Sequence, residues 1–135
     1  MNDLQLEVLA AHLGEDKDYA EDVEDDYLVL TDEEADEACA EYIADSLWAF
    51  NASFILSECG LDGSGEESLR QMQEKSCEGA NAFILSLVEN TCGITEFAES
   101  AISADGRGHF LSQYDGEETE QETENDGTFY IYRTN

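Results

Sequence analysis

An aspartate, an arginine and a histidine occur within five residues in the segment ADGRGHF, Ala104 to Phe110. These side chains could transfer protons, so Asp105, Arg107 and His109 form a candidate catalytic set on a glycine-flanked loop. The alternative is a helix-ending turn, in which Asp105 caps the next short helix and Arg107 pairs with a neighbouring acid. A general base needs an oriented partner and a pocket, so we favour the turn and predict that the chain is not an enzyme.

No other pattern of residues indicates a metal site, a cofactor site or an activated nucleophile. The four cysteines are separated by 20, 18 and 15 residues, whereas zinc sites use closely spaced pairs. The acidic stretches DGSGEESL and DGEETEQETENDG do not fit the calcium-binding EF-hand pattern. We therefore predict reduced, mostly buried thiols, no metal and no cofactor.

Carboxylates are the remaining groups with a chemistry to offer. The segment DEEADEACAEYIAD, Asp32 to Asp45, has seven of them in fourteen residues and no cation. The whole chain has 34 acidic and five basic residues, a net charge of −29. Solubility requires a charge of only about 2 to 8 in a small domain, and a larger charge destabilises the compact state. Direct binding to nucleic acid is disfavoured because phosphates would be repelled. The expected partner is a strongly basic surface, or cations at very high salt.

These carboxylates need ordered elements to hold them. The 135 residues include enough aromatic and aliphatic side chains for a core. An amphipathic helix is predicted from Asp3 to Gly14, followed by an acidic linker or frayed turn. The segment YLVL, Tyr27 to Leu30, is typical of a strand. Thr31 and Glu34 fit a capping box, which predicts a helix beginning at Asp32.

Further helices are predicted in the rest of the chain. The uncharged segment from Ser46 to Ser57 is expected to form core helices with a break at Asn51. Helices are also predicted over residues 66–89, with a bend or split at Gly79, and over residues 95–104. The final TFYIYR alternates as a strand does and should pair with YLVL on top of the helices. Its tyrosines, if exposed, would suit a homodimer or a partner contact.

The predicted fold class is mainly α with a small β element, with a short antiparallel pairing that involves the C-terminal strand. Residues 1–26 are interpreted as an acidic N-terminal helix and linker. Residues 27–135 are interpreted as a single globular domain with an acidic loop at about 115–127. We expect neither a membrane span nor a signal peptide, because no apolar run reaches about 18 residues and no basic segment precedes an apolar one.

The spacing of the carboxylates suggests a mimic of nucleic acid. Duplex DNA has a negative charge about every 1.7 Å along its axis. Carboxylates at positions i and i+4 of a helix lie about 5–6 Å apart at their Cβ atoms, so rows of them on a rigid core can approximate the phosphates that flank a groove. The predicted partner-binding residues are Asp32, Glu33, Glu34, Asp36, Glu37, Glu41, Asp45, Asp16, Asp18, Glu21, Asp22, Glu24, Asp25 and Asp26. A secondary set is Glu117, Glu118, Glu120, Glu122 and Glu124.

Two segments, YLVLTDEEADEACAEYIADSLWAFN and AISADGRGHFLSQYDGEE, resemble a family of small acidic bacteriophage proteins of unassigned function. The resemblance covers Tyr27 to Asn135 and implies a phage accessory role in the host cytoplasm. Small acidic phage proteins often counter host defence by DNA mimicry, as antirestriction and some anti-CRISPR proteins do, although this sequence matches none of those particular proteins. The expected partner is a basic nucleic-acid-binding host protein or complex. The alternatives are a halophile-type acidic protein and a small enzyme that uses Asp105, Arg107 and His109.

Overall fold

The computed structural model describes all of residues 1–135, which form helices and one small antiparallel sheet. This confirms the predicted fold class. The chain divides into two compact units. The sheet unit comprises Met1–Cys39 and Asp105–Asn135, and the helical unit comprises Ala40–Ala104. The division does not fall near residue 26, because residues on both sides of that position pack into one core. No helix combines the length and the apolar character that crossing a membrane requires.

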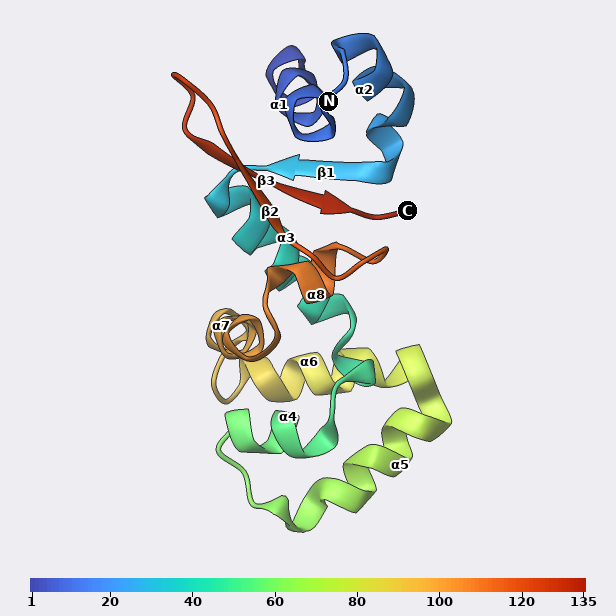
Figure 1. The fold of residues 1–135 in the computed structure, drawn as a ribbon. Helices are drawn as coiled ribbons and strands as arrows, with labels where there is room; N and C mark the ends of the chain where they lie inside the picture. Colours follow the sequence, from blue (N-terminus) through green and yellow to red (C-terminus); the bar gives the residue numbers. More distant parts are fainter. The chain divides into compact units, whose positions relative to one another are not determined.

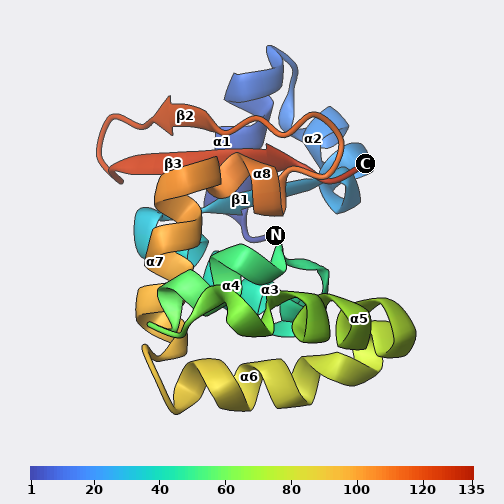
Figure 2. The same cartoon turned by 90° about the horizontal axis from the view of Figure 1, so that it is seen from below.

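The sheet has the strand order β1-β3-β2, with β3 in the centre (Figure 2). Strand β1 (Tyr27–Leu30) and strand β2 (Thr119–Glu122) both pair antiparallel with β3 (Thr128–Arg133). The predicted pairing of YLVL with TFYIYR is confirmed, with Leu28 opposite Tyr132. Strand β2 lies within the segment that the sequence assigned to an acidic loop. Its residues TEQE have no apolar alternation, so β2 leaves no hydrophobic signal in the sequence.

Two helices cover one face of the sheet (Figure 1). Helix α1 (Asp3–Leu13) begins with a capping box between Asn2 and Gln5 and ends at Gly14, which has the left-handed conformation at φ 70°. Helix α2 (Lys17–Val23) follows, with Asp16 as its N-cap, and continues into a 3₁₀ turn at Glu24–Asp26. The acidic segment that the sequence left as a linker or frayed turn is therefore helical.

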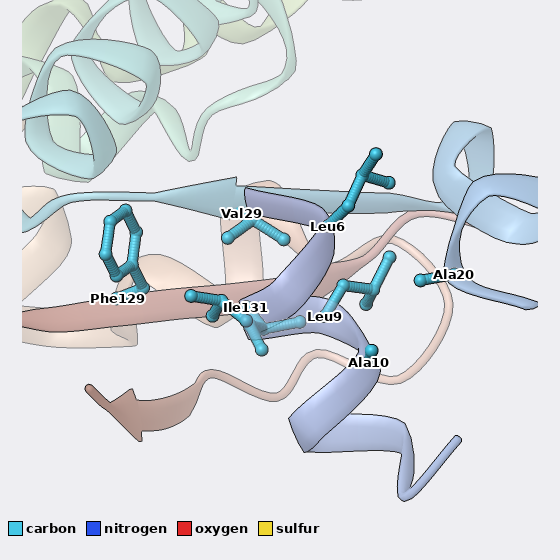
Figure 3. Packing of buried hydrophobic residues seen from close by; sticks show 8 residues of the cluster. Leu6, Leu9, Ala10, Ala20, Val29, Phe129 and Ile131 are labelled. Atoms are coloured by element: carbon cyan, nitrogen blue, oxygen red, sulfur yellow. The ribbon is translucent and has the colours of Figure 1, made fainter. Parts of the chain in front are cut away.

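An apolar cluster joins these helices to the sheet, and Figure 3 shows its packing. Val29 of β1 and two residues of β3 face α1, as the alternation of TFYIYR predicted. Ala20 of α2 is completely buried there, which fixes the acidic helix to the core. The cluster comprises Leu6, Val8, Leu9, Ala10, Ala20, Val29, Phe129 and Ile131.

Helix α8 (Arg107–Leu111) lies on the side of the sheet opposite to α1 and α2 (Figure 1). Its Arg107 contacts the ring of Tyr130 on β3. Tyr132 is fully buried and Tyr130 is half-buried, so the expectation of exposed tyrosines on the last strand is wrong. Helix α3 (Asp32–Asp45) begins in the sheet unit and ends in the helical unit. Its predicted capping box is confirmed, because the Glu34 amide donates to Thr31 Oγ1 and the Thr31 amide donates to Glu34 Oε1.

The helical unit consists of short helices with apolar inner faces. Its elements are a 3₁₀ turn at Leu47–Ala49, α4 (Ala52–Glu58), a 3₁₀ turn at Gly63–Gly65, α5 (Glu66–Ser76), a 3₁₀ turn at Cys77–Ala80, α6 (Asn81–Glu89) and α7 (Ile94–Asp105). The predicted break at Asn51 is confirmed, since Asn51 caps α4. The predicted split near Gly79 is also confirmed. The rings of Phe50, Phe54 and Phe97 pack against one another with centroids 5.3–6.1 Å apart.

Gly108 allows two segments of the sheet unit to approach closely. A Cβ atom at this position would lie 2.5 Å from the carbonyl oxygen of Gly116 and 2.9 Å from the amide nitrogen of Glu118. Both atoms belong to the backbone and cannot rotate away, so only glycine fits between α8 and residues 116–118.

We predict that Gly108→Ala destabilises the sheet unit by about 1–3 kcal/mol, because the added methyl must displace backbone. Urea unfolding followed by circular dichroism measures this change. Gly79→Ala is the matched control, since a Cβ there meets its nearest neighbour at an ordinary 3.7 Å and helical alanine is favoured over glycine. Equal stability of the two variants would contradict the close approach at Gly108.

Candidate functional site

The three residues of the candidate catalytic set do not converge. Asp105 is the last residue of α7 and is exposed, and Gly106 rather than Asp105 occupies the N-cap position of α8. His109 is also exposed. Its ring packs edge-on against the ring of Phe110, with the two centroids 4.9 Å apart. The guanidinium of Arg107 contacts neither of them and bonds instead to carboxylates that lie far away in the sequence.

Arg107 connects three carboxylates from two segments of the sheet unit. Its Nη1 lies 2.8 Å from Asp32 Oδ1 and 3.1 Å from Asp36 Oδ1, both in the first turns of α3. Its Nε lies 2.8 Å from Glu118 Oε2, just before β2, and Nη2 adds a 3.3 Å bond to Glu118 Oε1. The side chain of Arg107 is only 10% exposed. One guanidinium therefore holds α3, α8 and the start of β2 together.

Aromatic and thiol groups surround this ion cluster. The guanidinium lies 4.5 Å from the ring centroid of Tyr130, within the range of a cation–π contact. The hydroxyl of Tyr132 donates to Glu118 Oε2, so β3 is tied to the same carboxylate. Cys39 Sγ lies 3.9 Å from the carbonyl oxygen of Arg107.

The protonation states in the cluster are fixed by burial and by these bonds. Burial raises the pKa of Tyr132, and its hydrogen bond to Glu118 raises that pKa further. Burial by itself would lower the pKa of Arg107, but the bonds to Glu118 and Asp32 outweigh it and the pKa is raised. Burial raises the pKa of Cys39 to about 12. The arginine is therefore charged, and the tyrosine and the thiol are neutral, over the whole physiological range.

The carboxylates predicted on α3 fall into three groups. Asp32 and Asp36 pair with Arg107, and Glu34 serves the capping box. Glu33 and Glu37 are exposed and make no hydrogen bond or ion pair. Glu41 and Asp45 are also exposed and lie in the part of α3 that belongs to the helical unit. The sequence predicted the capping role of Glu34 but did not distinguish Asp32 and Asp36 from the exposed acids, because their partner Arg107 is distant in the chain.

The other predicted acids lie on or beside α2, on its 3₁₀ turn, and on or beside β2. Most are exposed, but Asp16 caps α2, Glu24 lies 3.3 Å from the amino group of Met1, and Asp26 accepts a bond from Asn135. On the β2 side, Glu118 is bound by Arg107 and Tyr132. The exposed carboxylates of these elements are Asp18, Glu21, Asp22, Asp25, Glu117, Glu120, Glu122 and Glu124.

The charge is concentrated in the sheet unit. This unit has 23 acidic and three basic residues, whereas the helical unit has 11 acidic and two basic residues. Each basic side chain of the sheet unit already has a partner. Besides Arg107, Lys17 lies 2.9 Å from Asp3, and Arg133 stacks over the ring of Tyr114 at 3.9 Å. Arg107 and Lys17 are thus paired with acids, and Arg133 forms no ion pair, so the three cations leave most of the exposed carboxylates of the unit without a partner.

The arrangement contains no group of three or more histidine, cysteine, aspartate or glutamate side chains that could hold a metal ion. Comparison with protein-family models, with curated protein sequences and with solved structures found no match to this chain. The geometry of the site consists of outward-facing carboxylates and of one arginine that holds together the elements that carry them.

We predict that Arg107→Gln lowers the free energy of unfolding by about 1–3 kcal/mol, because three carboxylates lose their shared partner. Added salt should restore part of this loss by screening their repulsion. Chemical unfolding at low and high NaCl concentrations measures both effects. Arg70→Gln is the matched control, since Arg70 forms an exposed pair with Glu67 and its loss should change stability by no more than about 0.5 kcal/mol. An Arg107→Gln variant as stable as the Arg70→Gln variant would contradict the role of Arg107.

We also predict that Cys39 resists alkylation at about pH 8, where an ordinary thiol is partly ionised and reactive. Cys39 is completely buried and its pKa is raised, whereas Cys77 is exposed and should react quickly. Mass spectrometry after brief treatment with iodoacetamide identifies the modified residue. Cys39 should be modified faster in the Arg107→Gln variant, because α8 is no longer tied to α3, the helix that carries Cys39. Equal labelling of Cys39 and Cys77 in the chain without the substitution would contradict this prediction, because it would show that the surroundings of Cys39 open readily to the reagent.

Proposed function

We propose that the chain is a phage-encoded nucleic-acid mimic that occupies the basic DNA- or RNA-binding surface of a host defence protein. The observation that carries this proposal is the excess of ordered, uncompensated carboxylates on the sheet unit. Each carboxylate offers the charge and the acceptor oxygens that Lys and Arg residues meet on a phosphate. The partner would therefore find its nucleic-acid-binding residues satisfied by protein.

The order of these carboxylates supports the proposal. Glu33 and Glu37 lie one helical turn apart on α3, and the acids of α2 are fixed to the core by Ala20. Charge on a helix is preorganised, so it loses less conformational entropy on binding than charge on a mobile tail. The many exposed carboxylates would also attract a basic partner over a distance and speed the encounter.

The class of partner follows from this charge. An inhibitor of a CRISPR effector, of a restriction enzyme or of a recombination nuclease would need to cover a strongly basic channel. An anti-defence role of this kind is also what the motifs of residues 27–135, which resemble those of small acidic phage proteins, led us to expect. Binding of the chain itself to nucleic acid is disfavoured, since both molecules are strongly negative.

The test uses charge reversal on α3. We predict that replacing Glu33, Glu37 and Glu41 by Lys removes the capture of basic nucleic-acid-binding proteins from a bacterial lysate at about 50 mM salt. The fold should be unharmed or slightly stabilised, because three like charges at helical spacing no longer repel. Mass spectrometry of the retained proteins and circular dichroism of the variant measure the two effects.

The control makes the same change of charge elsewhere. Replacing Glu66, Glu74 and Glu78 by Lys alters α5 and the turn after it, in the helical unit. This variant should retain most of the capture. If both variants lost capture equally while folded, the chain would act through its total charge and not through a spaced surface.

A further inference from the structure

Strand β2 has an outer edge along which most backbone groups have no hydrogen-bond partner within the chain. The amide of Thr123 donates to the carbonyl of Gly127 at 2.9 Å, which makes residues 123 and 127 a hydrogen-bonded pair. Bonded and non-bonded pairs alternate in an antiparallel ladder, so Glu120 and Glu122 occupy non-bonded pairs with β3. Their N–H and C=O groups point away from β3. The nearest internal partner is the side chain of Gln121, which reaches the carbonyl of Glu122 only at 3.4 Å.

The other edge of the sheet is different. By the same alternation Val29 of β1 points its backbone groups outward, and Gln5 of α1 donates to the Val29 carbonyl at 2.9 Å. A side chain of the chain thus covers the β1 edge, as native proteins commonly do. On the β2 edge the only such contact is the longer bond from Gln121 to the Glu122 carbonyl, and the outward groups of Glu120 have none. Strand β2 lies at the margin of the sheet (Figure 2).

A groove runs beside the open edge, between α1 and the hairpin that joins β2 to β3. Its volume is about 250 Å³. Leu4, Val8 and Ala11 of α1 provide an apolar side. The acidic residues that line it are Glu7, Glu122, Glu124 and Asp126. No Lys or Arg lines it, and all three basic side chains of the sheet unit are engaged elsewhere.

We propose that an extended basic segment of the partner protein adds to the sheet along β2 and places a Lys or Arg side chain in this groove. The backbone groups of Glu120 and Glu122 would supply the pairing, as in other cases of strand addition to a sheet edge. A long basic side chain suits the groove because its methylene stem can lie on the apolar residues while its charge meets the carboxylates.

The charges select this occupant over others. A second copy of the chain would bring its own β2 glutamates against Glu120 and Glu122, and the repulsion opposes edge-to-edge pairing. A neutral segment would pair without compensating the acids of the groove. The inference rests on the proposed function for the sign of the partner's charge, but it names a different contact from the α3 surface.

The test uses a synthetic peptide of alternating lysine and threonine, with an equally charged peptide of alternating lysine and proline as control. Proline cannot donate to a ladder, so only the first peptide can extend the sheet. Amide hydrogen exchange of the full chain is followed by NMR. We expect the lysine–threonine peptide to slow exchange at Glu120 and Glu122 by at least about tenfold, a change of about 1.4 kcal/mol, and the control peptide to leave it unchanged. Equal effects of the two peptides, or no effect of either, would overturn the inference.

A pair of variants separates the backbone contact from the charge. Glu120→Thr and Glu120→Pro each remove one carboxylate, but only the proline removes the outward N–H, which β3 does not need. Glu120→Pro should bind the lysine–threonine peptide at least about tenfold more weakly than Glu120→Thr, with β3 amides still protected. Equal affinities would overturn the strand pairing. If pairing failed while α3 charge reversal still abolished capture, this inference alone would be wrong. If pairing held while α3 reversal had no effect, the proposed function alone would fail.

Discussion

The ion cluster around Arg107 is the interaction on which the sheet unit depends. A chain with 34 acidic and five basic residues cannot neutralise its charges pairwise, so the position of each cation matters. Arg107 is nearly buried and uses all three nitrogen atoms of its guanidinium to bind Asp32, Asp36 and Glu118. A lysine has no planar fork and could not bridge these carboxylates in the same way. One arginine thereby allows an acidic helix start, a glycine-flanked turn and an acidic strand to lie against one another.

The same arrangement explains why the remaining carboxylates can stay uncompensated. Ala20, Leu9 and Ile131 are fully or almost fully buried, and their packing holds α1 and α2 on the sheet despite the repulsion among exposed acids. Capping bonds of Asp16 and Thr31 add local stability where the acidic helices begin. Stability is concentrated in the core and in the Arg107 cluster, and the outer surface is left with many carboxylates that form no ion pair. The proposed mimicry depends on this separation between a stable interior and an acidic surface.

The sequence predicted those features that depend on local pattern. The capping box at Thr31, the break at Asn51 and the pairing of YLVL with TFYIYR each rest on residue types at fixed spacing, and the structure confirms them. Strand β2 was missed because its residues are polar and its pairing is set by β3. The sequence predicted that Arg107 pairs with a neighbouring acid, and Glu118 is 11 residues away. The two partners of Arg107 on α3 were missed because they lie 71 and 75 residues away. A signal existed, since Gly106 and Gly108 flank an arginine in a chain with few cations, but spacing alone does not identify a distant partner.

The most direct test of the account is whether its partner can hold DNA at the same time. Proteins retained by the immobilised chain at low salt are incubated with labelled duplex DNA, and the DNA bound to the retained complex is measured. The account predicts mutual exclusion: the retained proteins bind no DNA, and excess duplex releases them from the chain, because carboxylates and phosphates occupy the same basic surface. Retained proteins that bind duplex DNA as well as they do when free would contradict nucleic-acid mimicry, whatever the affinity of the complex.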